Sequence, residues 1–370
     1  MTTVFDPIDL AGRHLANRIV MAPMSRSRAY GPLACPCPSA VLYYRQRAGA
    51  GLIVSEGIQP SAAARGYDAT PGLHTDAQVA AWRDVTDAVH AAGGTIFAQL
   101  MHAGRIGHPS LLPDGARPVG PSPVIADATI FTKEGLRACV VPQELTATEI
   151  RAIINGFAAA ARNAMSAGFD GVELHGANGF LVHQFLSANA NTRTDAWGGS
   201  VAGRIRFAVE AAEALAAAVG AERVGLQVSP GNPYNDIAED DSHTLYTALV
   251  SALEGCGLAY LSIAEGPDRD LTLRLRERWP GVFMLNPFTG PRPTGLEELG
   301  LVEDGTADLL SFGSMFLANP DLPRRLAQGG PFNRPDPSTY YGGSDHGYTD
   351  YPSLDGLDER GAAEPASARS

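Results

Sequence analysis

The sequence has almost no lysine, because Lys133 is the only one in a chain of 370 residues. Catalysis through a Schiff base needs a lysine amine in the active site. Lys133 lies in a long segment that we expect to form a surface lid and not part of a regular strand. An aldolase mechanism that starts from a lysine imine is therefore disfavoured.

Cysteine is also scarce, with only Cys35, Cys37, Cys139 and Cys256 in the chain. Four cysteines make no disulfide framework for a protein of this length. Cys35 and Cys37 are separated by one proline, a spacing compatible with a thiol at a pocket rim or with a soft-metal site. No Cys or His pair that would complete such a site lies nearby in the sequence. We interpret both as reduced loop cysteines and expect no metal site.

Long apolar runs and a positive charge balance are missing too. No apolar stretch has the length of a membrane-spanning helix, and no basic segment precedes an apolar one near the first residue. The formal net charge of −12 argues against nucleic acid or an anionic membrane as the main partner. We expect a cytoplasmic protein, either a monomer or a homodimer, that binds a small molecule.

Short β-branched runs alternate with longer amphipathic, alanine-rich stretches, a pattern typical of βα units on a parallel sheet. Eight such units favour closure into a (β/α)₈ TIM barrel over an open sheet. The helix ahead of the fourth strand begins with a capping box, Thr146 and Glu149, and Gly168 follows its end. Strands are predicted at Asn17–Ala22, Leu52–Ser55, Thr95–Leu100, Gly171–His175, Arg223–Val228, Ala259–Ile263, Val282–Leu285 and Ala307–Phe312, and helices at Asp76–Ala92, Ala147–Ala167, Val201–Val219 and Thr244–Glu254.

Three segments fall outside the βα pattern. Phe5–Leu15, with a turn at Ala11 and Gly12, predicts an N-terminal hairpin that closes the barrel floor. The stretch from Pro113 to Leu145 is too long for a βα loop and predicts a β-rich lid inserted after the third strand. Residues 1–353 are interpreted as a single barrel domain, and residues 354–370, rich in Gly, Ala, Ser and charge, as a disordered tail.

A series of motifs in fixed order runs through the first 350 or so residues, and it resembles the Old Yellow Enzyme family of FMN-dependent ene-reductases. One such motif would be weak support, but the ordered series is strong. The motifs are Asn17–Arg26, Tyr43–Ala48, Gly51–Glu56, Gln99–His102, His175–Phe185, Arg193–Asp195, Gly198–Ser200, Ala318–Leu322 and Gly347–Pro352.

The resemblance implies a carbonyl-binding pair at His175 and Asn178, just beyond the fourth strand. Barrel enzymes place their chemistry at this end of the strands. Two neutral donors that converge on one oxygen suit a developing enolate. The resemblance also implies that Ser25, Gly57 and Gln99 contact the flavin ring.

The sequence departs from the family at positions that the resemblance links to catalysis and to the flavin. Phe180 replaces the tyrosine that protonates the substrate, and Met101 replaces a tryptophan. Gln227 replaces an arginine beside the flavin ring. Gly313 and Ser314 replace a Gly-Arg pair at the phosphate.

The turn after the seventh strand is changed as well. It reads Leu285–Phe288, where the family has a glycine-rich turn. Proline lacks the backbone N–H that such a turn donates to phosphate, and phenylalanine is larger than glycine. The changes together remove two cations and at least one backbone donor. We therefore interpret the flavin site as degenerate.

This interpretation predicts a barrel without FMN or any other cofactor that performs non-redox chemistry. His175 and Asn178 would polarise a conjugated carbonyl or polyene substrate for cyclisation or isomerisation, such as a cycloaddition or conjugate addition, in secondary-metabolite biosynthesis. Phe180, Tyr67, Tyr351, Tyr30 and Met101 are candidates for the substrate pocket.

Two alternatives remain open. The chain is alternatively an FMN-dependent, NAD(P)H-using ene-reductase of α,β-unsaturated carbonyls. In that case the cofactor is bound by Ser25, Gly57, Gln99, Gln227, Gly313 and Ser314. The second alternative is a non-catalytic barrel that binds a ligand, although the intact His175 and Asn178 pair counts against it.

Overall fold

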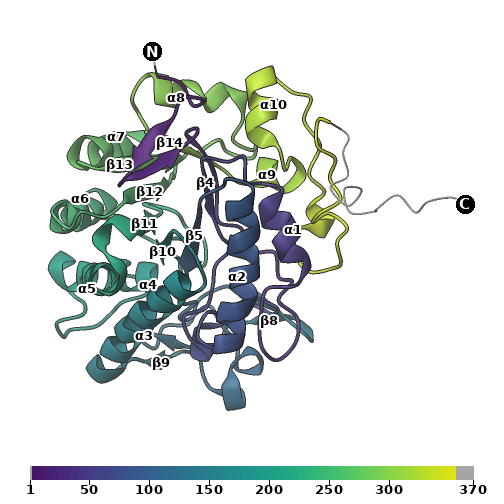
Figure 1. Ribbon diagram of the computed structural model, residues 1–370. Helices are drawn as coiled ribbons and strands as arrows, with labels where there is room; N and C mark the ends of the chain where they lie inside the picture. Colours follow the sequence, from purple (N-terminus) through teal and green to yellow (C-terminus); the bar gives the residue numbers. More distant parts are fainter. Residues whose placement is uncertain (1, 356–370) are drawn as a thin grey trace, which may run out of the picture.

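The computed structural model describes residues 2–355 and shows a closed, parallel eight-stranded barrel surrounded by helices (Figure 1). All eight predicted strands are present, each ending within about two residues of its expected bounds. The spatial order is β10-β11-β12-β13-β14-β3-β4-β5, so the last strand closes onto the first. The barrel strands are β3 (Ile19–Met21), β4 (Leu52–Val54), β5 (Ile96–Leu100), β10 (Gly171–Gly176), β11 (Val224–Val228), β12 (Tyr260–Ala264), β13 (Val282–Asn286) and β14 (Leu309–Phe312).

Helices follow the strands and cover the outside of the barrel. The four helices predicted from the sequence are present with ends shifted by no more than about two residues. The helices are α1 (Ser39–Arg45), α2 (Asp76–Ala91), α3 (Ala147–Ser166), α4 (Leu181–Leu186), α5 (Val201–Val219), α6 (Ser242–Leu253), α7 (Arg269–Arg278), α8 (Gly300–Glu303), α9 (Ser314–Ala318) and α10 (Leu322–Gln328). Single 3₁₀ turns are η1 (Ala62–Ala64), η2 (Pro109–Leu111), η3 (Pro113–Gly115), η4 (Ala221–Arg223), η5 (Leu296–Glu298) and η6 (Pro337–Thr339).

Helix α3 begins as its capping box predicts. Thr146 accepts a hydrogen bond from the backbone N–H of Glu149, and the Glu149 carboxylate accepts from the N–H of Thr146. Two donors at the free end of the helix are thereby satisfied. Gly168, with φ of +87°, ends the helix in a conformation that favours glycine.

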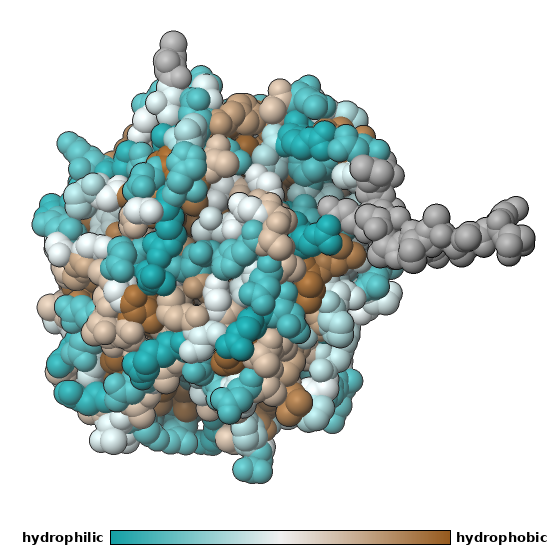
Figure 2. Space-filling view, in the orientation of Figure 1, coloured by the Kyte–Doolittle hydropathy of each residue, from teal (hydrophilic) through white to brown (hydrophobic). Residues whose placement is uncertain are grey.

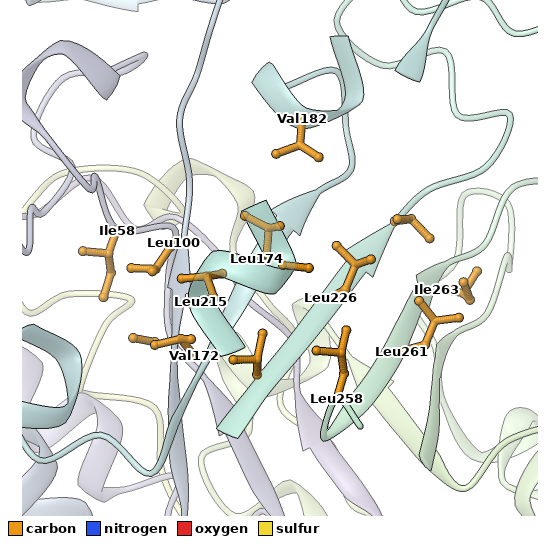
Figure 3. Packing of buried hydrophobic residues seen from close by; sticks show 14 of the residues in the cluster. Ile58, Leu100, Val172, Leu174, Val182, Leu215, Leu226, Leu258, Leu261 and Ile263 are labelled. Atoms are coloured by element: carbon orange, nitrogen blue, oxygen red, sulfur yellow. The ribbon is translucent and has the colours of Figure 1, made fainter. Parts of the chain in front are cut away.

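Alternation along the strands separates the apolar layer from the polar interior. Val172 and Leu174 of β10 and Leu226 of β11 belong to the cluster of buried apolar side chains that packs against the helices, including Leu215 of α5 (Figure 3). The intervening residues of β10 point into the barrel, as shown by the hydrogen bond from the Tyr260 hydroxyl of β12 to Glu173. The interior of the barrel therefore holds a buried carboxyl, Glu173, on the face of β10 opposite to the apolar layer.

The predicted N-terminal hairpin is present as β1 (Ile8–Leu10) and β2 (Arg13–Leu15), which pair antiparallel across a turn at residues 11 and 12. Leu10 and Leu15 are fully buried and pack with residues near the beginning of the barrel strands, among them Tyr260 and Leu309. The hairpin therefore closes the barrel at the end where the strands begin.

The insertion after β5 carries four short strands, as the predicted β-rich lid requires. The strands are β6 (Val119–Gly120), paired in parallel with β9 (Gln143–Glu144), and β7 (Thr129–Thr132), paired antiparallel with β8 (Gly135–Ala138). Arg193 fastens the base of the insertion, because its Nη1 donates to the carbonyl oxygens of Pro121 and Leu145. Figure 1 places the insertion (β8 and β9) at the end of the barrel opposite the purple hairpin.

On the face shown in Figure 2, apolar side chains form small groups separated by hydrophilic ones.

None of the helices within residues 2–355 combines the length and apolar character needed to cross a bilayer. The tail predicted for residues 354–370 lies, apart from its first two residues, outside the described residues.

Candidate functional site

His175 occupies the carboxyl end of β10, where barrel chemistry is expected. Its side chain is buried, and its Nδ1 accepts a hydrogen bond from the backbone N–H of Ala177 at 3.2 Å. Burial, helped by nearby His183, lowers the pKa of His175 to about 3. The imidazole is therefore neutral at pH 7, with its proton on Nε2 ready to be donated.

Asn178 follows two residues after β10 in a left-handed conformation, with φ of +54°. Its backbone N–H donates to the Ser229 hydroxyl at 2.8 Å, and its carbonyl oxygen accepts from the Asn235 amide at 2.8 Å. Its side-chain oxygen accepts from the Asn232 amide at 3.1 Å. These contacts fix the backbone and the amide oxygen, so the amide NH₂ of Asn178 is left to donate.

Three buried polar side chains, His183, Glu239 and Tyr246, form a hydrogen-bonded group next to the loop that carries Asn178. His183 of α4 accepts the backbone N–H of Gly179 on Nδ1 at 3.1 Å, and its Nε2 donates to Glu239 at 3.1 Å. The Tyr246 hydroxyl donates to the same carboxylate oxygen at 3.0 Å. His183 was visible in the motif after Asn178, but no local pattern links it to residues about 60 positions away.

Phe180, Tyr67 and Met101, all predicted pocket residues, come together beside His175. The Phe180 ring packs edge-on against the imidazole, with centroids 5.0 Å apart, and the Tyr67 ring packs edge-on against Phe180 at 6.1 Å. Met101 and Phe180 share a buried cluster with Ile130, which belongs to the insertion. The insertion therefore contributes to the apolar cluster beside His175.

The other two predicted pocket tyrosines lie elsewhere. Tyr30 is 57% exposed, and its hydroxyl donates to the carbonyl oxygen of Gly343. The Tyr351 hydroxyl accepts the backbone N–H of Asp336 at the surface. Tyr234 and Tyr341, which the motif analysis missed, approach Tyr67 closely enough to add to the rise that burial causes in its pKa.

A cluster of polar side chains lies inside the barrel, on strands β5, β10, β11 and β12. The side-chain nitrogen of Gln99 donates to Glu173 at 2.8 Å and to the amide oxygen of Gln227 at 3.1 Å, and Tyr260 donates to Glu173 at 3.0 Å. Burial raises the pKa of Glu173 to about 7. Within the described chain, the amide oxygen of Gln99 and the amide nitrogen of Gln227 have no hydrogen-bond partner. One acceptor and one donor are thus available side by side.

Gly57 and Ser25 lie beside the strands that border this cluster. Gly57 follows β4, and a Cβ added to it would come within 2.9 Å of the Met101 sulfur, so only glycine fits there without a shift. Ser25 is half-buried in the segment after β3. The contact of either residue with a flavin ring stays a prediction.

A surface pocket of about 250 Å³ lies where β12, β13 and β14 end. Gly313 and Ser314 line it, together with Pro287 and Phe288 from the turn after β13. The Phe288 side chain is 54% exposed, and its N–H donates to the buried Glu265 carboxylate at 2.9 Å. The phenylalanine therefore borders this surface pocket.

Comparisons with known proteins give one consistent result. The sequence profile of the NADH:flavin oxidoreductase / NADH oxidase family matches residues 3–333. A probable flavin mononucleotide-dependent alkene reductase of Leishmania infantum is 41% identical, over 94% of this chain and 96% of that protein. 12-Oxophytodienoate reductase 1 of Oryza sativa subsp. japonica is 40% identical, over 95% and 93% respectively.

Solved structures agree in fold and in sequence. Morphinone reductase in complex with tetrahydroNAD matches with a TM-score of 0.90 at 40% identity, covering 96% of this chain and 98% of that chain. The Old Yellow Enzyme homologue from Zymomonas mobilis matches with a TM-score of 0.91 at 35% identity, covering 95% and 100%.

These findings correct the expectation of a cofactor-free cyclase or isomerase, which is wrong. Relatives of about 40% identity along nearly the whole chain include an FMN-dependent alkene reductase and other reductases, and they support FMN with NAD(P)H. The expectation counted the cations lost at Gln227 and Ser314 and the backbone donor lost at Pro287, but it left out that Gln227 retains a free amide donor. The chain belongs to the NADH:flavin oxidoreductase / NADH oxidase family, the family of Old Yellow Enzyme.

Proposed function

We propose that this protein is an FMN-dependent, NAD(P)H-using ene-reductase that reduces the C=C bond of α,β-unsaturated carbonyl compounds. The observation that carries the proposal is the pair of neutral donors, His175 Nε2 and Asn178 Nδ2, at the carboxyl end of β10. Inside the barrel, the free amide groups of Gln99 and Gln227 match a planar heterocycle with alternating donors and acceptors.

The residues present fit FMN at the ring end. The free amide oxygen of Gln99 can accept from the N–H of a uracil-like edge, and the free NH₂ of Gln227 can donate to its carbonyl oxygen. Gly57 and Ser25 would border the ring, and Gly313 and Ser314 the phosphate end. When bound, FMN supplies the hydride for the β-carbon, having received it from NAD(P)H.

His175 and Asn178 activate the substrate. Both donate hydrogen bonds to the carbonyl oxygen, which draws electron density away from the β-carbon and stabilises the negative charge that develops on the oxygen. Removing one preorganised donor of this kind costs about 3–4 kcal/mol of transition-state stabilisation. Because the pKa of His175 is lowered to about 3, the imidazole is neutral at pH 7 and donates a hydrogen bond without transferring its proton.

The proton for the α-carbon has to come from a group other than Phe180, which has none to give. Tyr67 is an ionisable side chain of the same cluster, packed edge-on against Phe180. We propose that the Tyr67 hydroxyl, or water admitted beside it, delivers this proton. Phe180 and Met101 would then hold the apolar part of the substrate, with the insertion as a lid that helps to select it.

The test is a spectroscopic titration of the purified protein. Bound flavin with absorbance near 450 nm, bleached by NADPH or NADH without oxygen and restored by 2-cyclohexenone, is the expected result. His175→Ala is expected to keep the flavin and its bleaching but to lose restoration by the enone. A protein that binds no flavin after incubation with FMN and desalting, or whose flavin NAD(P)H fails to bleach, would refute the proposal.

A further inference from the structure

We infer that Arg292 supplies the positive charge that binds the phosphate of the cofactor, in place of the arginine that Ser314 replaces. The inference rests on the proposed function, because it concerns how the same FMN site holds its anionic end. Arg292 lies in the loop between β13 and η5, four residues beyond Phe288 of the turn that follows β13.

The position of the pocket carries the first step. It is formed by the ends of β12, β13 and β14 and by the loop of residues 287–294. In eight-stranded barrels, phosphate is commonly bound by the loops after the seventh and eighth strands, which here are β13 and β14. A Cβ added to Gly313 would meet only the Met24 sulfur, at 3.9 Å, so a ligand can approach this backbone closely.

The charges lining the pocket carry the second step. Among the described residues that line the pocket, Arg292 is the one with a positively charged side chain. Glu265 is the one carboxylate, and it is held by Arg269 of α7 through contacts of 2.5 and 2.8 Å. The charge of Glu265 is therefore compensated by Arg269. Arg292, which is itself paired with Glu297 and Glu298, is the cation of the lining that a phosphate would meet.

The backbone of the turn after β13 can contribute little to phosphate binding. Pro287 has no N–H to donate. The N–H of Phe288 is already engaged by Glu265 at 2.9 Å. This turn therefore supplies little to a phosphate dianion, and the Ser314 hydroxyl, which can donate to it, carries no charge.

The free N–H groups of the Arg292 guanidinium carry the last step. Its Nη2 contacts Glu298 at 2.5 Å and Glu297 at 3.0 Å. Its Nε and Nη1 have no hydrogen-bond partner in the described part of the chain, and the side chain is 46% exposed. The glutamates hold Nη2, and the N–H groups of Nε and Nη1, which point to different sides of the guanidinium, stay free for one charge-assisted hydrogen bond to phosphate.

If Arg292 binds the phosphate, the preference of the protein for FMN over riboflavin depends on this side chain. FMN and riboflavin share the ring that Gln99 and Gln227 would contact, and they differ in the phosphate. Loss of Arg292 should therefore weaken the binding of FMN and leave that of riboflavin unchanged. Loss of a charged hydrogen-bonding partner corresponds to about a ten- to hundredfold rise in Kd.

The experiment measures the Kd of FMN and of riboflavin for the flavin-stripped full chain, by quenching of flavin fluorescence without any turnover. The variants are Arg292→Gln and, as the matched control, Arg278→Gln, a surface arginine whose ion pair with Glu254 lies on the outer helices. We expect Arg292→Gln to raise the Kd of FMN ten- to hundredfold with riboflavin unaffected, and Arg278→Gln to change neither. Unchanged riboflavin binding also shows that the variant is folded.

Arg292→Lys, which keeps the charge but has a single donor nitrogen, serves if Arg292→Gln does not fold. It should weaken FMN binding severalfold and leave riboflavin binding unchanged. Equal affinity of the unmodified protein for FMN and riboflavin, or unchanged FMN binding by Arg292→Gln, would overturn the inference and leave the proposed function standing. Failure of the unmodified protein to bind either flavin would overturn both.

Discussion

Glu173 allows a direct test of the polar cluster inside the barrel. Its carboxyl is fully buried and accepts hydrogen bonds from Gln99 and Tyr260, but no arginine or lysine is among these partners. Burial raises its pKa from 4.5 to about 7. We predict that Glu173→Gln, which removes the titrating group, changes how the stability of the protein depends on pH.

The sign follows from the raised pKa. Between about pH 4.5 and pH 7 the unfolded chain has released the Glu173 proton while the folded chain retains it, so the wild-type protein loses stability as the pH rises through this window and little above it. One pKa unit corresponds to about 1.4 kcal/mol, so the loss between pH 5 and pH 8 is roughly 2 to 3 kcal/mol. Glu173→Gln lacks this loss.

The measurement is the free energy of unfolding by urea of both proteins at pH 5 and pH 8. Any hydrogen bond weakened by the amide is weakened at both pH values, and Glu56, whose pKa is also raised to about 7, is present in both proteins. Both effects cancel in the double difference. The variant should gain roughly 2 to 3 kcal/mol on the wild type from pH 5 to pH 8. A double difference near zero would show that Glu173 is ionised in the folded protein and would refute the reasoning.

Three further predictions concern the pocket and the barrel frame. Asn178→Ala should lower kcat/KM for an enone by about a hundredfold or more in steady-state assays while flavin absorbance is retained; an unchanged value would remove Asn178 from the carbonyl site. Phe180→Tyr should speed reoxidation of the reduced enzyme by enone about tenfold or more, as followed by stopped flow, because it adds an acid beside the substrate; no acceleration would show that protonation is not limiting. Thr146→Ala should cost about 1 kcal/mol in urea unfolding because α3 loses its N-cap, whereas Ala147→Ser, one residue along, should cost much less.

The barrel was predictable because its signals are local. Each strand is a short apolar run, and α3 is bounded by a capping box at Thr146 and Glu149 and by Gly168. Turn residues 11 and 12 similarly indicated the hairpin. These features depend on neighbours within a few positions, so the sequence states them directly.

The cofactor could not be inferred correctly by counting replaced residues. Gln227 and Ser314 are visible as lost cations, but the hydrogen bond that turns the Gln99 amide toward Gln227 joins residues on strands far apart in the chain. Arg292 lies in an irregular loop with no motif, and its neighbourhood becomes apparent only where three strands end together. The support of Asn178 by Ser229 and Asn235 was hidden for the same reason.

Closure of the barrel joins the two ends of the sheet, and this has a consequence for how the chain folds during synthesis. Strand β3 pairs with β14, where Ile19 lies opposite Leu310, so a segment made at the start must wait for one made near residue 310 of 370. Until then the edges of β3 and β13 lack their barrel partner, and unpaired strand edges promote association with other chains. The nascent protein therefore carries two open strand edges until its eighth strand has emerged from the ribosome.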